Sequence, residues 1–240
     1  MTKQIAYILL LCTSLGFAQD TDTQLRINPS VDYKINKKWK VGLDYRYALE
    51  KDISTFQASV LQVAGEYKIT KRIALEAGYR FTTSFENDNH RLFASFIYDY
   101  KIKKFTLSSR TRYQFSTPHF NSDYWNEYKE PNQYLREKIT IDYNIPKSKA
   151  SVYFSPEFFV KIKDGRLAYH RTRYQLGSDY KLKYGSTIGL SVMYEDRLNP
   201  MKTDRFVFTT KYNLSLDELL NKKKEKEKKD KKDKNKKDKE

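Results

Sequence analysis

The chain has 240 residues, and 46 basic against 30 acidic side chains give it a formal net charge of +16. Its mean hydropathy is −0.82, and after the first 20 residues no apolar run reaches the roughly 18 residues of a membrane-spanning helix, so such a helix is excluded. A single cysteine, Cys12, excludes an internal disulfide.

The first residues have the pattern of a secretory signal peptide. Lys3 supplies a positive start, Ile5 to Leu15 form a short apolar stretch, and Gly16-Phe17-Ala18 place small residues before a cleavage site. We expect residues 1–18 to be removed on export, which also removes Cys12. The mature chain then begins near Gln19.

From about residue 25 to residue 214, apolar and polar side chains alternate. In the segment 39–50 one parity is apolar, comprising Trp39, Val41, Leu43, Tyr45, Tyr47 and Leu49. Alternate side chains of a strand share a face, and a tilted strand of about 10 residues crosses a bilayer. Residues 19–214 are therefore predicted to form an all-β, antiparallel up-and-down transmembrane β-barrel of ten to twelve strands, in contact with outer-membrane lipid.

Eleven segments carry this alternation. They are 25–35, 39–49, 57–69, 72–83, 91–102, 105–115, 134–145, 150–160, 168–182, 186–197 and 204–214. Eleven strands would bring the first and last together in parallel, whereas bacterial single-chain barrels have even numbers, so we favour ten or twelve. Either the first segment, with Pro29, threads the lumen, or a further strand lies in the segment 116–133.

The expected connections alternate in length along the chain. Short ones, such as Thr70-Lys71 and Lys103-Lys104, are expected in the periplasm, and longer ones, such as 116–133 and 162–167, outside the cell. The longest, 116–133, contains His119, Phe120, Tyr124, Trp125 and Tyr128. It is a plug folded into the barrel, an exposed binding tip or an ordinary surface loop.

The polar parity of the strands carries an unusual number of arginines, which we predict to face the lumen as an anion belt. These candidate site residues are Arg46, Arg80, Arg110, Arg112, Arg136, Arg171, Arg173 and Arg205. Guanidinium groups bind phosphates and carboxylates through paired hydrogen bonds, which indicates a vestibule for anions. Alternatively, these arginines pair with interior acids such as Asp44, Glu76 and Glu195 and brace a closed barrel.

The sequence predicts no enzyme. His90 and His119 fall in loops or at strand edges, His170 has the lipid-side parity of its strand, and no nucleophile, phosphate-loop or metal-ligand motif occurs. We therefore expect no catalytic residues, no cofactor and no metal. The signal peptide argues against nucleic-acid binding, and so does the tail, since it accounts for much of the positive charge.

Residues 215–240 form a distinct, Lys-rich C-terminal tail. Ser215 to Leu220 could begin a helix, and residues 221–240 hold 12 lysines and 6 acids without one apolar side chain. Such a segment cannot bury a core and is expected to be disordered or a solvated helix. Placed in the periplasm, it either meets an anionic partner such as peptidoglycan or anionic lipid, or has no partner.

Several motifs resemble a family of uncharacterised outer-membrane β-barrels that is common in Bacteroidota. They are His170-Arg-Thr-Arg-Tyr-Gln-Leu-Gly, Arg110-Thr-Arg-Tyr, Asn36-Lys-Lys-Trp and Asp44-Tyr-Arg-Tyr. The resemblance implies a barrel and a location over residues 24–214, and no activity. Two functions remain open, a narrow channel for small anionic solutes and a closed structural or binding barrel whose basic tail contacts the cell wall. The oligomeric state is open too.

Overall fold

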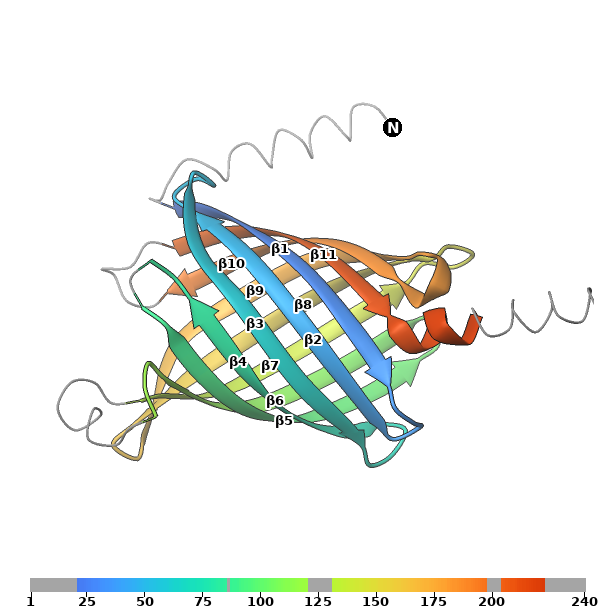
Figure 1. Ribbon diagram of the computed structural model, residues 1–240, viewed down its shortest axis with the longest axis horizontal. Helices are drawn as coiled ribbons and strands as arrows, with labels where there is room; N and C mark the ends of the chain where they lie inside the picture. Colours follow the sequence, from blue (N-terminus) through green and yellow to red (C-terminus); the bar gives the residue numbers. More distant parts are fainter. Residues whose placement is uncertain (1–20, 86, 121–130, 198–203, 223–240) are drawn as a thin grey trace, which may run out of the picture.

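The computed structural model describes residues 21–85, 87–120, 131–197 and 204–222. Within these ranges eleven strands form one closed barrel (Figure 1). The strands are β1 (Thr21–Lys34), β2 (Trp39–Glu50), β3 (Thr55–Lys68), β4 (Ile73–Thr83), β5 (Asn89–Ile102), β6 (Phe105–Thr117), β7 (Asn132–Asn144), β8 (Ala150–Lys163), β9 (Arg166–Lys181), β10 (Thr187–Arg197) and β11 (Asp204–Ser215). Each of the eleven alternating segments is a strand, and the bounds lie within four residues of those expected.

Neighbouring strands pair antiparallel around the barrel, and the first and last strands close it in parallel. The parallel seam runs from Thr21 opposite Asp204 to Asp32 opposite Ser215. Our preference for ten or twelve strands is therefore wrong. Because eleven strands alternate in direction, β1 and β11 must point the same way, and the barrel closes between them as the eleven-strand count requires.

Both explanations offered for an even number are also wrong. β1 is not threaded through the lumen, because it pairs with β2 on one side and β11 on the other. No further strand separates β6 from β7, because these two pair directly from Phe105 opposite Tyr143 to Ser116 opposite Asn132. The β1–β2 ladder has a gap at Asn28 and Pro29, where proline supplies no N–H to donate.

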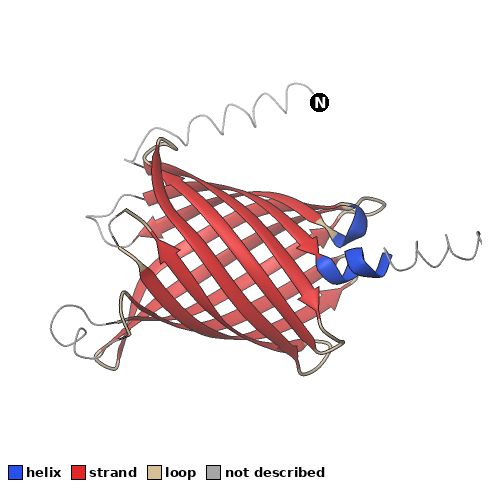
Figure 2. Ribbon diagram, viewed as in Figure 1, coloured by secondary structure: helices blue, strands red, loops and turns tan. Residues whose placement is uncertain are grey.

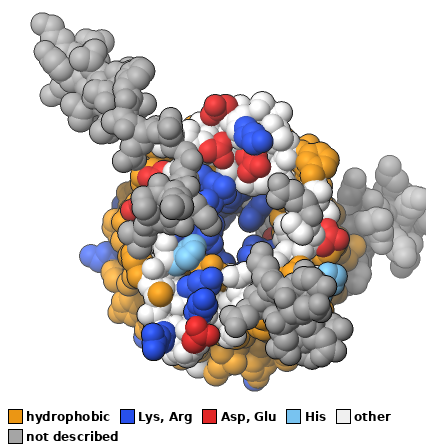
Figure 3. All heavy atoms as spheres, turned by 90° about the vertical axis from the view of Figure 1, so that its left-hand side faces the viewer, with side chains coloured by type: hydrophobic (Ala, Val, Ile, Leu, Met, Phe, Trp, Pro, Cys, Tyr) orange, Lys and Arg blue, Asp and Glu red, His pale blue; other side chains and the backbone are white. Residues whose placement is uncertain are grey.

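The alternation sorts side chains between the barrel exterior and its lumen. Leu43 is 49% exposed on the outer surface, whereas Val207 and Phe159, both on the inner face, are 0% and 1% exposed. Hydrophobic side chains accordingly surround the barrel in the end-on view (Figure 3). Strands of this length are long enough to cross a bilayer when they are tilted by about 45°, as strands of membrane barrels generally are.

The connections at the two ends of the barrel differ less in length than expected. We call the end at which β2, β4, β6, β8 and β10 finish the loop end, and the opposite one the turn end. The connection expected at 162–167 is reduced to Asp164 and Gly165, whose φ angles of 51° and 70° suit a tight hairpin turn. The predicted alternation of loop length is thus not observed, apart from the long segment 118–131.

Residues 216–222 form a helix at the turn end (Figure 2), as Ser215 to Leu220 indicated. Nζ of Lys34 lies 3.7 Å from a carboxylate oxygen of Asp217 and 3.6 Å from one of Glu218, which ties this helix to β1. No helix in the described ranges is long and apolar enough to cross a membrane. The expected signal peptide, most of the Lys-rich tail and loop residues 121–130 lie outside the described residues.

Candidate functional site

All eight predicted arginines lie on the inner face of the barrel, toward the loop end or at mid-height. They share this face because each occupies the polar parity of its strand, opposite the outward apolar parity. The inner face also presents Arg26 of β1, Arg91 of β5 and Arg197 of β10, which the sequence analysis did not single out. The same parity rule identifies all three.

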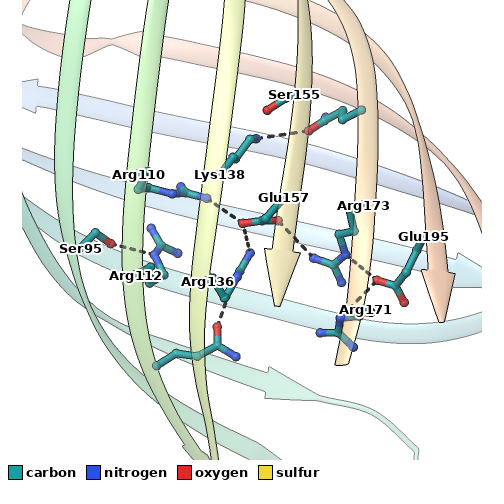
Figure 4. A network of polar contacts seen from close by, with 12 residues as sticks. Ser95, Arg110, Arg112, Arg136, Lys138, Ser155, Glu157, Arg171, Arg173 and Glu195 are labelled. Carbon is teal, nitrogen blue, oxygen red and sulfur yellow. Dashed lines mark hydrogen bonds and ion pairs between the residues drawn. The ribbon is translucent and has the colours of Figure 1, made fainter. Parts of the chain in front are cut away.

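Glu157 on β8 is the centre of one ion-pair cluster (Figure 4). Its Oε1 accepts hydrogen bonds from Arg136 at 2.7 Å and Arg110 at 3.3 Å, and its Oε2 lies 3.8 Å from Arg173. Glu157 is 6% exposed and Arg136 is 7% exposed. Three strands, β6, β7 and β9, are thereby joined to β8 through one carboxylate. The sequence analysis did not identify Glu157, although this residue has the inward parity of its strand.

Glu195 on β10 is the centre of a second cluster. Arg173 donates to its Oε2 at 2.5 Å and Arg197 to its Oε1 at 2.8 Å, while Arg171 lies 3.7 Å away. Arg173 therefore bridges the two carboxylates, as Figure 4 shows. On β6, Arg112 is paired separately with Glu76 at 2.5 Å and donates to Ser95 at 2.8 Å.

Two inward phenylalanines pack against these guanidinium groups. The ring centre of Phe159 lies 4.4 Å, 4.3 Å and 4.6 Å from the guanidinium carbons of Arg136, Arg171 and Arg173. Phe93 lies 4.1 Å from that of Arg112. A cation over an aromatic face is stabilised electrostatically, and the ring also restricts its orientation. We call Arg110, Arg112, Arg136, Arg171, Arg173 and Arg197 the carboxylate-braced arginines.

A second group of arginines is held by neutral amides instead. Arg80 donates two hydrogen bonds to Oε1 of Gln62, at 2.9 Å and 2.5 Å, and the same Gln62 donates to Asp44 at 3.1 Å. Arg26 donates to Gln24 at 3.3 Å, and Gln24 donates to Asp22 at 2.7 Å. In both cases an amide separates the guanidinium from the carboxylate.

Arg46 completes this group, because its Nε donates to Oδ1 of Asn28 at 3.2 Å. We call Arg26, Arg46 and Arg80 the amide-held arginines, and in the described part of the chain none of them forms an ion pair with a carboxylate. Arg91 is held similarly by the hydroxyl of Ser116 at 2.8 Å. Arg205, at the seam, lies 4.0 Å from Asp22. Arg46 on β2 and Arg80 on β4 are five and four strands away from Glu157 on β8, whereas Arg26 on β1 is two strands away from Glu195 on β10.

The three amide-held arginines and four of the carboxylate-braced ones line one cavity in the lumen, with a volume of about 410 Å³. Ten of its lining side chains are cationic and five are acidic, an excess of five positive charges. Lys138 and Lys211 belong to this lining, and they donate to Gln175 at 3.4 Å and to the hydroxyl of Tyr153 at 2.7 Å. Figure 3 shows a hollow at the loop end with Lys and Arg side chains around it.

The histidines correct one prediction. His170 does not follow the lipid-side parity, because a bulge in the β8–β9 ladder between Phe159 and Val160 leaves it without a register partner. Its ring packs edge-on against Tyr134, whose side chain contacts the inward Phe159. His90 lies on the outer surface, where its Nδ1 is 2.6 Å from the hydroxyl of Tyr79. The described residues include no cluster of three potential metal ligands.

Comparison with known proteins finds one matching family and several solved structures with low sequence identity. A family model described as "Protein of unknown function (DUF2490)" matches residues 24–206. A search of curated proteins found no match. The NanC porin structure is 14% identical with a TM-score of 0.49, covering 74% of this chain and 87% of that one. A bacterial polysaccharide outer-membrane secretin is 14% identical (TM-score 0.44; 76% and 64% covered), and Pseudomonas aeruginosa OpdL is 9% identical (TM-score 0.35; 71% and 55% covered).

Proposed function

The chain belongs to the family of proteins of unknown function DUF2490, and we propose that its barrel lies in the outer membrane and conducts small anions such as phosphates and carboxylates. The outer surface supports the location, because exposed apolar side chains cover every strand. Water would oppose this exposure and lipid favours it.

The observation that carries the proposal is the set of amide-held arginines. Asn28 and Gln62 fix the guanidinium groups of Arg46 and Arg80 without cancelling their charge. A guanidinium bonded to a neutral amide still has free N–H groups for an anion, and bidentate contact with a phosphate or carboxylate suits them. Their place on the wall of a cavity with excess positive charge favours anions over cations.

The carboxylate-braced arginines have a different task in this proposal. Glu157 and Glu195 connect the consecutive strands β6 to β10 along the inner wall of the barrel and hold that wall in shape. Four arginines of the predicted anion belt, Arg110, Arg112, Arg171 and Arg173, each lie within 4.0 Å of a carboxylate, at 3.3, 2.5, 3.7 and 2.5 Å. We therefore assign bracing to these four and anion contact to Arg26, Arg46 and Arg80.

We place the turn end in the periplasm. The helix 216–222 lies there, and the Lys-rich residues that follow it would then reach anionic polymer or lipid on the inner side of the membrane. This orientation rests on where the chain leaves the barrel, because the connections do not differ enough in length to decide it.

The test is the ion preference of the purified barrel in planar bilayers under a KCl gradient. We expect a reversal potential that reports chloride as the more permeant ion. Arg46→Gln with Arg80→Gln should reduce this preference, because a unit charge about 6 Å from an ion in water contributes about 0.7 kcal/mol. Two such charges correspond to a reduction of up to about tenfold in the permeability ratio at low salt.

Arg72→Gln with Arg166→Gln is the matched control, because both side chains are exposed, neither lines the cavity, and the net charge changes equally. This control should leave the reversal potential unchanged. Equal effects of the two pairs would refute the assignment to the amide-held arginines. A folded barrel without any conductance would refute the channel and leave a closed binding barrel.

A further inference from the structure

One acidic side chain lies on the outer surface at the middle of the barrel. Glu137 occupies the outward parity of β7, between Leu135 and Ile139, which are both 37% exposed, while its neighbours Arg136 and Lys138 line the lumen. β7 runs from Asn132 to Asn144, so Glu137 is near its midpoint. Among the described residues, no other Asp, Glu, Lys or Arg faces outward in the central part of a strand.

Glu137 is held by two hydroxyl groups of β6. Ser109 donates to its Oε1 at 2.7 Å and Thr111 donates to its Oε2 at 2.5 Å. Thr111 is the register partner of Glu137, and Ser109 is that of Ile139. These three polar residues, which we call the Glu137 cluster, lie among exposed apolar side chains of the outer surface.

The surroundings of the cluster are aromatic and aliphatic. On the adjoining strands Phe96 is 45% exposed and Phe158 is 37% exposed. Thr111 is opposite Phe96 and Glu137 is opposite Phe158 in the ladders. A carboxyl group in contact with lipid is unfavourable, so acidic residues at this depth usually have a polar partner.

We propose that the Glu137 cluster is the contact through which two copies of this barrel associate in the membrane. Two copies inserted in the same direction and related by a two-fold axis parallel to the barrel axis bring residues of equal height together. Each Glu137 then faces the hydroxyls of the other copy. The cluster contains hydroxyl donors and carboxyl acceptors, so it is complementary to itself.

The rest of the outer surface favours a second copy of the same cluster over a contact with another face. No outward cation at mid-height in the described chain could neutralise Glu137 in a head-to-tail arrangement. In the symmetric pair the two Glu137 carboxyls share one proton, which adds a hydrogen bond between the copies while Ser109 and Thr111 keep their bonds within each copy. Interhelical contacts in membranes use the same polar side chains for association, and the reason, that lipid offers no alternative partner, applies equally to strands.

The experiment is cross-linking between copies in lipid vesicles, using a Cys12→Ser chain with one new cysteine. Ile139→Cys, beside the cluster, should give dimers with a short bismaleimide. Leu43→Cys, at a similar height on β2 across the barrel and 49% exposed, is the matched control and should not. On dilution into excess lipid, the dimer yield of Ile139→Cys should stay above that of random collision. A fall of this yield to the Leu43→Cys level would show that no contact exists.

Glu137→Leu in the Ile139→Cys chain should lower the dimer yield about fivefold, the factor that corresponds to a hydrogen bond of about 1 kcal/mol. Glu137→Gln should retain the dimer, because the amide both donates and accepts. The heat-induced shift of the folded barrel on gels verifies that each variant is folded. Unchanged cross-linking in Glu137→Leu, equal cross-linking at Leu43→Cys, or capture of a different protein by Ile139→Cys in native membranes would overturn the proposal. Conductance of Glu137→Leu should match the parent, which separates this result from the test of the channel.

Discussion

Replacing Glu157 by Gln tests whether the ion-pair clusters brace the barrel. The substitution keeps the size of the side chain and removes one negative charge, so it creates no cavity. Arg136 at 2.7 Å, Arg110 at 3.3 Å and Arg173 at 3.8 Å then lose a common counter-ion. Arg173 keeps Glu195, whereas Arg110 and Arg136 have no other carboxylate within pairing distance among the described residues.

The size of the effect follows from burial. Glu157 is 6% and Arg136 7% exposed, and removing one partner of a buried ion pair costs about 3–5 kcal/mol because the remaining charge is uncompensated. The Gln amide still accepts one hydrogen bond and the lumen admits water, so we expect a loss of about 3 kcal/mol in the free energy of unfolding. Urea unfolding in vesicles, followed by tryptophan fluorescence, measures it.

Glu66→Gln is the control for Glu157→Gln. Glu66 has one partner, Lys40 at 3.0 Å, and their side chains are 17% and 32% exposed. A partly solvated pair of this kind contributes about 1 kcal/mol or less. If the two variants lose equal stability, or if Glu157→Gln loses less than about 1 kcal/mol, the clusters do not brace the barrel and our division of the arginines is wrong.

Two further predictions concern single positions in the lumen wall. Gln62→Ala should lower chloride preference as Arg80→Gln does, because without the intervening amide Arg80 can pair directly with Asp44; an unchanged reversal potential would contradict this. Gly177→Ala should cost about 1–3 kcal/mol in urea unfolding, since its Cβ would lie 2.5 Å from the ring of Tyr153 and 2.8 Å from Ser191. Gly65→Ala, whose Cβ would meet nothing within 4 Å, should unfold like the parent, and a similar loss there would argue against crowding as the cause.

The sequence alone was enough to locate the strands and to assign their faces. A strand repeats every two residues, so the parity of Trp39, Leu43 and Tyr45 determines that Asp44 and Arg46 point the other way. This local rule predicted all eleven strands and the inward position of all eight arginines. It applies equally to Glu157 and Glu137, which shows that a charged residue of either parity could have been found by the same reading.

Only the tertiary structure decided how the barrel closes and which charges meet. The strand number depends on whether β1 reaches β11, and those residues are about 180 positions apart in the chain. Likewise Arg110 on β6 meets Glu157 on β8 across the intervening strand, and Arg173 bridges two carboxylates, because the curvature of the sheet brings inner side chains together. The bulge beside Val160, which removes His170 from its expected face, is another non-local outcome. Side-chain parity is a property of one strand, whereas pairing and closure are properties of the whole sheet, which is why the first could be predicted and the second could not.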